Sequence, residues 1–228
     1  MLFRSASRAD ALVVCCSAQA EFLRDKLKIP ESRIHIVLEH VDNRFFSPGP
    51  ARPDKERRLI AGVGLEKRDY RTLAQASHDL DVDVRISGFS RYAALLAKSS
   101  PDSLPANMTR RYYSWPDLVQ LYRDADIVVA PLFPCSYAAG VTTLMEGMCS
   151  RRPVIVSRSP GLADYLDPHD GLSIVNPLDS EGLRQAIVQL LEHPEKSRDQ
   201  ADLGFRLGSQ RYDFDQAVNR LELLLQGS

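Results

Sequence analysis

The residues best suited to bind an anion follow Gly140 in the sequence: Val141, Thr142, Thr143 and, about one helical turn further on, Glu146. A helix that starts at the glycine would present its first free amides and two threonine hydroxyls to a phosphate, at the positive end of the helix dipole. The glutamate would lie one turn below, where a carboxylate can accept hydrogen bonds from sugar or ribose hydroxyls. An ordinary strand-to-helix connection has the same pattern, so spacing alone leaves both interpretations open.

A second candidate loop runs from Gly62 to Arg68. Gly62 and Gly64 allow the backbone to turn closely under an anion, and Lys67 and Arg68 can neutralise its charge. A lone Gly-x-Gly is not a dinucleotide-binding fingerprint, and a tight turn followed by two solvated basic residues is the alternative. Gly88 ends the next apolar run and belongs to a third candidate loop. Ligands of parallel α/β sheets bind beyond the carboxyl ends of the strands, so we expect the three loops to converge.

Short apolar runs alternate with helical patterns along the whole chain. β-Branched and alternating runs predict strands at 11–16, 33–38, 59–64, 82–88, 109–113, 127–132, 153–157 and 171–175. Apolar spacing and capping residues predict helices at 17–28, 70–76, 91–98, 116–124, 141–148, 161–166, 181–191 and 214–225, with Ser17 as the cap of the first. The alternation predicts an α/β fold with a doubly wound, mostly parallel, Rossmann-like sheet.

The composition excludes several classes of protein. The 228 residues include 29 basic and 30 acidic side chains, which gives a net charge of −1 and no basic field for nucleic acid or an anionic membrane. No apolar run approaches the roughly 18 residues that span a bilayer, and no secretion signal is recognisable. The four cysteines lack Cys-x-x-Cys spacing, and no histidines are paired at metal-binding distance. We therefore expect a cytoplasmic protein with reduced thiols and no metal or other cofactor.

The stretch around Gly140 resembles the signature region of family-4 retaining glycosyltransferases, which have the two-domain GT-B architecture. The resemblance rests on a strand ending in Pro-Leu at 131–132, the Gly-Val-Thr turn at 140–142, Glu-Gly-Met at 146–148 where the family usually has Glu-Ala-Met, and Pro-Val-Ile-Val-Ser at 153–157. In that family this region binds the nucleotide-sugar donor. The resemblance implies the C-terminal half of a GT-B fold.

The beginning of the chain resembles the passage between the two domains of the same family. The matching residues are Ser17, Pro30, Arg33, Ile34, Val41, Asp42, Phe46 and Pro48. The resemblance implies that residues 1–48 are the end of the acceptor-binding domain and the crossover, and that residues 49–228 form the donor-binding domain. Whether the chain is a natural short protein or part of a longer one stays open.

The resemblance also implies roles for individual residues. If Gly62 matches the family's loop glycine, Arg68 takes the position of a lysine that reaches the donor diphosphate, whereas Val63 stands where the family has an arginine. Glu146 matches the second glutamate of a Glu-x7-Glu pattern, which binds ribose hydroxyls. Ala138 replaces the first glutamate, which contacts the transferred sugar. The helix start would stabilise the departing nucleotide without a metal, and no catalytic residue is assigned.

Three functions follow from these observations. The first is transfer of a sugar from a nucleoside diphosphate sugar with retention, by this chain or by an enzyme of which it is the donor-binding half. The second is a non-catalytic nucleotide-sugar-binding module that needs a partner chain for the acceptor site. The third is a related GT-B enzyme such as a sugar epimerase. The sequence identifies neither the nucleotide nor the sugar nor the acceptor.

Overall fold

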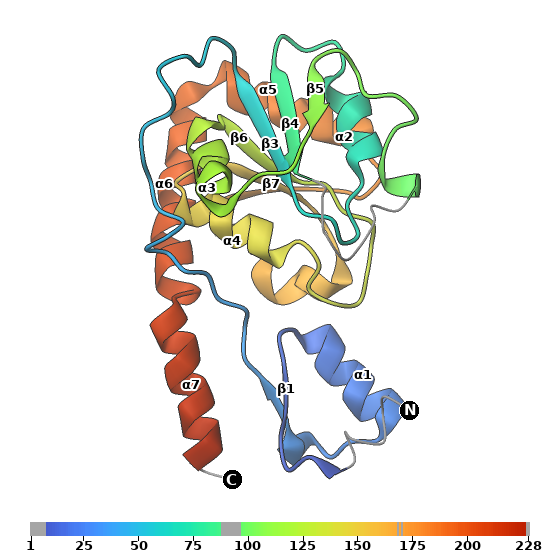
Figure 1. Cartoon of the computed structure of the whole chain (residues 1–228). Coiled ribbons are helices and arrows are strands. Elements are labelled where there is room, and N and C mark those ends of the chain that lie inside the picture. Colours follow the sequence, from blue (N-terminus) through green and yellow to red (C-terminus); the bar gives the residue numbers. More distant parts are fainter. Residues whose placement is uncertain (1–7, 88–96, 168, 170, 227–228) are drawn as a thin grey trace.

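A six-stranded parallel sheet forms the centre of the computed structural model, which describes residues 8–87, 97–167, 169 and 171–226. The strand order is β5-β4-β3-β6-β7-β8, and every neighbouring pair is parallel (Figure 1). The strands are β3 (Leu59–Val63), β4 (Asp83–Ser87), β5 (Met108–Arg110), β6 (Ile127–Ala130), β7 (Val154–Ser157) and β8 (Leu172–Val175). Helices cover both faces, which confirms the predicted α/β class with a doubly wound, Rossmann-like sheet.

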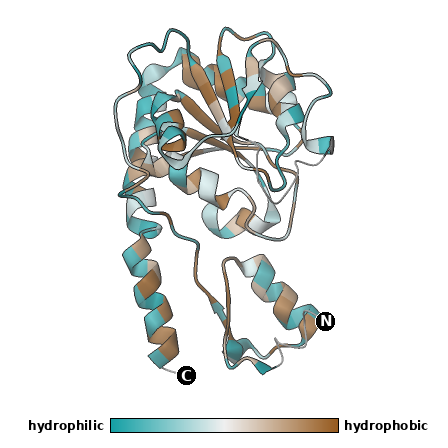
Figure 2. Ribbon diagram, viewed as in Figure 1, coloured by the Kyte–Doolittle hydropathy of each residue, from teal (hydrophilic) through white to brown (hydrophobic). Residues whose placement is uncertain are grey.

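The central strands are buried on both faces because their alternate side chains enter two different cores. In β6, Val128 and Ala130 pack in one core, and Ile127 and Val129 pack in the other. Side chains of consecutive strand residues point to opposite faces, so a strand covered on both sides must be apolar throughout. Figure 2 accordingly shows the central strands mainly in the brown of hydrophobic residues.

The helices divide between the two faces. The chain forms α2 (Tyr70–Ser77), α3 (Trp115–Asp124), α4 (Val141–Cys149), α5 (Ser180–Glu192), α6 (Pro194–Arg211) and α7 (Phe214–Gln226), with short 3-10 helices η3 (Ala97–Ser99) and η4 (Pro160–Tyr165). Helices α2 and α5 pack on one face and on each other, whereas α3 and α4 cover the other face and α6 packs on α4. Within the described residues, no helix is both long and apolar enough to cross a bilayer.

Helix α6 was not predicted from the sequence. Its buried residues are Ala201, Gly204 and Gly208, so the face that packs inward carries small side chains in place of large apolar ones. A Cβ atom added to Gly208 would lie 3.0 Å from Cβ of Met148 in α4, which shows how closely the two helices approach. Because the sequence signal of an amphipathic helix is a stripe of large apolar residues, a stripe of small residues gives none.

A smaller unit precedes the sheet. Strands β1 (Leu12–Val14) and β2 (Ile34–Ile36) form a two-stranded parallel sheet, joined by α1 (Ser17–Leu27) and the 3-10 turn η2 (Glu31–Arg33). Its own small core contains Ala20, Ile29 and Ile34. Figure 1 shows this unit apart from the main sheet, and α1 packs against η4. The division into domains at residue 48 stays a prediction.

The first turn of α1 is held by Asp164, a residue 147 positions further along the chain. The backbone N–H of Ser17 donates to one carboxylate oxygen of Asp164 at 2.7 Å, and its hydroxyl donates to the other at 2.5 Å. The N-cap residue is Cys16, which makes no side-chain cap, so the prediction that Ser17 caps its own helix was wrong. Tyr165 adds a second link, since its hydroxyl donates to the Cys15 carbonyl at 2.5 Å. Thus η4 fixes the N-terminal unit against the main sheet.

We expect Asp164→Ala to loosen α1 without unfolding the main sheet. Loss of a helix cap costs about 1 kcal/mol, so amides of the first turn should exchange about fivefold faster with solvent. Hydrogen exchange followed by mass spectrometry measures this difference. Asp167→Ala removes an exposed aspartate three residues away and is the matched control. Unchanged exchange in Asp164→Ala would show that the contact does not hold the helix.

Candidate functional site

Two of the three candidate loops lie side by side at the carboxyl ends of β3 and β6. The backbone N–H of Asp69 donates to the Pro131 carbonyl at 2.9 Å, and the N–H of Phe133 donates to the Lys67 carbonyl at 2.9 Å. Arg68 and Leu132 thereby form an isolated antiparallel bridge between the two loops. The structure brings the glycine loop to the segment that leads into α4. Gly88 of the third loop lies outside the described residues.

Arg68 is buried, with only 2% of its surface exposed, and all three guanidinium nitrogens donate to protein groups. Its Nε donates to the Val63 carbonyl at 2.7 Å, and Nη1 donates to the Glu66 carbonyl at 2.8 Å. Its Nη2 donates to Oγ1 of Thr143 at 2.7 Å, and that hydroxyl donates to the same Val63 carbonyl at 3.0 Å. Arg68 and Thr143 therefore join the glycine loop to the first turn of α4 instead of projecting into solvent.

Two glycines of the site adopt backbone conformations that favour this residue type. Gly64 has φ of 105°, and a Cβ atom there would lie 2.2 Å from Nη2 of Arg68. Gly140 has φ of 92°, and a Cβ atom there would lie 2.8 Å from Cδ1 of Leu132. Any larger residue would combine a strained backbone with a steric clash. Gly62 has an ordinary φ but a close neighbour, since a Cβ atom would lie 3.1 Å from the Tyr70 ring.

The start of α4 is open on one side. Gly140 is the N-cap residue and offers no side-chain acceptor to the free amides of the first turn. Thr142 is exposed there, whereas Val141 and Thr143 are buried. Of the two predicted threonine hydroxyls, only that of Thr142 faces solvent, because the other is held by Arg68 and Val63. The Val141 amide donates to the Ala138 carbonyl at 3.4 Å, which leaves the amides of Thr142 and Thr143 for a ligand. Unpaired amides at a helix start are a favourable environment for an anion.

Glu146 lies between α4 and α3, where the hydroxyl of Tyr122 donates to its Oε2 at 2.6 Å. Within the described residues, its other carboxylate oxygen has no hydrogen-bond donor. Burial raises the pKa of Glu146 to about 7, and the hydrogen bond from Tyr122 and the charge of Arg68 oppose this rise. The proton of this carboxyl group is therefore lost at a higher pH than that of a solvated glutamate.

No sequence signal indicates the role of Tyr122, which lies on the apolar face of α3 with Leu121. It is fully buried, as a core tyrosine would be, and Phe46 packs edge-on against its ring, with 5.8 Å between the two ring centres. Only the structure shows that its hydroxyl reaches Glu146 on the neighbouring helix.

Tyr137 adds a third connection between the two loops. Its hydroxyl donates to the Glu66 carboxylate, and Nζ of Lys67 lies 6.0 Å from the centre of its ring. Lys67 is half-buried and has φ of 54°, an uncommon value for a residue with a side chain. The contact places a cation and a carboxylate at the edge of the loops. Sequence reasoning identified Lys67 but neither Glu66 nor Tyr137.

The described residues contain no cluster of three or more histidine, cysteine, aspartate or glutamate side chains that could hold a metal ion. All four cysteines are free thiols. The expected independence from metals and other cofactors stays a prediction.

Comparison with known proteins identifies the family. Residues 58–193 match the family described as glycosyl transferases group 1, and the chain belongs to this family. The match covers β3 to the end of α5, which includes both loops and Glu146. No curated protein matches the sequence significantly.

Solved structures show the same fold. A sucrose-phosphate synthase from Thermosynechococcus elongatus is 17% identical with a TM-score of 0.77, over 96% of this chain and 58% of that protein. A glycosyltransferase from Rickettsia africae is also 17% identical with a TM-score of 0.77, over 94% of this chain and 62% of that protein. HepE of Anabaena, solved in complex with UDP-glucose, is 14% identical with a TM-score of 0.79, over 99% of this chain and 67% of that protein. The chain therefore has the C-terminal Rossmann-like domain of GT-B glycosyltransferases and spans about three fifths of the first two proteins.

We expect Arg68→Ala to destabilise the protein by about 3 kcal/mol, because it removes hydrogen bonds of a buried charged group and leaves acceptors without partners. Thr143→Val should cost less, about 1 kcal/mol, since a single neutral hydroxyl is lost. Urea unfolding measures both values. Lys67→Ala is the control, because it removes the neighbouring positive charge but none of these bonds. Equal stability of Arg68→Ala and Lys67→Ala would contradict the proposed anchoring role.

Proposed function

We propose that this chain binds a nucleoside diphosphate sugar and serves in transferring the sugar with retention, as the donor-binding half of a group 1 glycosyltransferase. The observation that carries the proposal is the joining of the glycine loop to the start of α4 by Arg68 and Thr143. Membership of the family and the UDP-glucose complex of HepE support the choice of ligand. The proposal assigns no catalytic residue, sugar or acceptor. We also propose that the protein acts in the cytoplasm.

The diphosphate would lie over the first turn of α4. The amides of Thr142 and Thr143 and the hydroxyl of Thr142 donate to phosphate oxygens, and Gly64 lets the backbone of the other loop approach them. The buried charge of Arg68 stands directly behind this turn, bonded to Thr143. Fixed dipoles and a fixed charge stabilise the negative charge that develops on the leaving nucleotide, because they need no reorganisation during the reaction. This mechanism uses no metal.

Glu146 would bind the ribose. Its second carboxylate oxygen can accept hydrogen bonds from the ribose hydroxyls, while Tyr122 holds the first oxygen in place. Protonation of the carboxyl group removes an acceptor, so nucleotide binding should strengthen as the pH rises through about 7, the pKa of this group.

Calorimetric titration with UDP, GDP and ADP tests this function. We expect one nucleotide to bind with a micromolar dissociation constant, at least tenfold more weakly to Glu146→Ala. Nucleotide affinity should rise between pH 6 and pH 8 in the wild type. In Glu146→Gln this rise should shrink to the part that the nucleotide's own ionisation produces. Glu181→Gln, on the exposed side of α5, is the control and should bind like the wild type. A folded chain that binds none of the three nucleotides would overturn the proposal.

A second candidate function is a non-catalytic nucleotide-sugar-binding module that docks on a protein supplying the acceptor site. The N-terminal unit favours it, because within the described residues β1 and β2 pair only with each other. Val13 is 48% exposed and Ile36 is 44% exposed on these strands. Open strand edges with apolar side chains are surfaces on which another chain can add strands.

Light scattering after size-exclusion chromatography tests the association. If these strands dock on another protein chain, we expect the wild type to self-associate at micromolar concentration and Val13→Thr combined with Ile36→Thr to reduce the association. Val175→Thr, in strand β8 of the main sheet, serves as the control. Association that the double variant leaves unchanged would count against these strands as the docking surface.

A further inference from the structure

A cavity of about 240 Å³ lies at the amino ends of β6 and β7, on the opposite edge of the sheet from the nucleotide site. Four arginines line it, Arg58, Arg151, Arg152 and Arg198, and its one acidic lining residue is Asp126. Its remaining wall is largely apolar and comes from the last turn of α5, the first residue of β6, Pro153 and the start of α6. Four positive charges against one negative charge make this the lining of an anion site.

Two of the four arginines have no ionic partner. Nη1 of Arg58 lies 3.2 Å from a carboxylate oxygen of Asp126, and Nε of Arg151 lies 2.5 Å from one of Asp202. Within the described residues, no carboxylate lies within ion-pair distance of Arg152 or Arg198. Four of the five charged residues that line the cavity are therefore positive, and two of these four make no direct ion pair.

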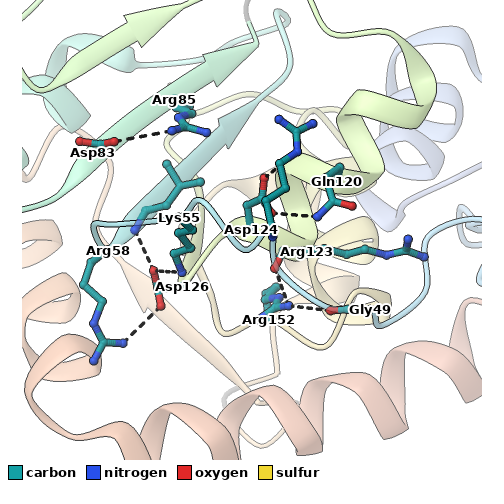
Figure 3. Close-up of polar contacts among 12 residues, drawn as sticks. Gly49, Lys55, Arg58, Asp83, Arg85, Gln120, Arg123, Asp124, Asp126 and Arg152 are labelled. Carbon is teal, nitrogen blue, oxygen red and sulfur yellow. Dashed lines mark hydrogen bonds and ion pairs between the residues drawn. The ribbon is translucent and has the colours of Figure 1, made fainter.

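Arg152 is the most constrained of the four. Its Nη2 donates to the carbonyls of Arg123 at 2.6 Å and Gly49 at 3.4 Å, as Figure 3 shows. Its Nε is buried without any hydrogen-bond partner. Burial lowers the pKa of Arg152, against the opposing charges of Asp126 and Asp124. A half-buried guanidinium with an unsatisfied N–H has a desolvation cost, and within the described residues neither of these two carboxylates offsets it with a direct ion pair.

The helix ends around the cavity add to its positive character. Helix α6 starts here with Pro194, and its N-cap residue His193 makes no side-chain hydrogen bond to the first turn. Arg151 follows Ser150, the C-cap residue of α4, and has φ of 56° at a position that glycine usually fills. Holding an arginine in this left-handed conformation costs some stability, and it places a guanidinium at the rim of the cavity.

We propose that this cavity is a second anion site that binds a phosphate dianion, either inorganic phosphate or the phosphoryl group of a phosphomonoester. The excess of arginines over the single lining aspartate suits a dianion, and the planar guanidinium groups can donate paired hydrogen bonds to its oxygens. The apolar wall leaves room for the carbon skeleton of a monoester. The site is independent of the proposed nucleotide site and stands whether or not that proposal holds.

Isothermal calorimetry of the full chain with sodium phosphate and with glycerol phosphate tests the proposal, in sodium chloride of matched ionic strength. We expect saturable one-site binding with a dissociation constant of millimolar or below. Arg198→Gln, at an exposed position, should weaken binding at least fivefold, and Arg58→Gln should also weaken it. Lys196→Gln removes the same charge from the same helix outside the cavity and should have no effect.

Other outcomes also decide the question. Tighter binding of glycerol phosphate than of inorganic phosphate would support a monoester as the ligand, and the reverse would support the free ion. Binding that is lost equally in Arg198→Gln and Lys196→Gln would overturn the proposal, because it would reflect general charge. Binding that is abolished in Thr142→Val but kept in Arg198→Gln would also overturn it, because the phosphate would then occupy the start of α4. No saturable binding of either ligand would do the same.

Discussion

The buried guanidinium of Arg68 is the interaction on which the carboxyl edge of the sheet depends. A charge that is 2% exposed is tolerated only with hydrogen-bond acceptors around it, and two carbonyls and a threonine hydroxyl supply them. This requirement fixes other residues. Gly64 must lack a side chain because the guanidinium fills that space, and Thr143 must point inward, which leaves Thr142 at the surface. The shape of the proposed phosphate site follows from one buried cation.

The sheet and most helices could be predicted because their residues carry strong periodic signals. Strands such as β6 are apolar throughout, and α3 and α5 show large apolar residues at helical spacing. The sequence also predicted that the loop after β3 and the loop after β6 lie together, since the carboxyl ends of parallel strands share one edge. It could not reveal α6, whose packing face is made of small residues. Nor could it give the direction of Arg68 or the contact between Tyr122 and Glu146, because both depend on tertiary packing.

Helix α4 connects two chemically different ends of the same domain. Its first residue lies at the loops beyond β3 and β6, and the two residues after its C-cap line the arginine cavity. With nine residues the helix is about 13 Å long. Its middle is held tightly to the sheet, because a Cβ atom on Gly147 would lie 2.9 Å from Val154. The helix therefore cannot shift without disturbing the buried strands, and its two ends keep a fixed separation.

The contact between Asp164 and Ser17 has a consequence for the order in which the chain folds. The two residues are 147 positions apart, so during synthesis α1 emerges long before the carboxylate that receives its first amide. A helix of eleven residues is marginal by itself in water. The N-terminal unit therefore gains the contact that holds the start of α1 only after residue 164 has been synthesised. One of the first helices made is among the last to receive all its stabilising contacts.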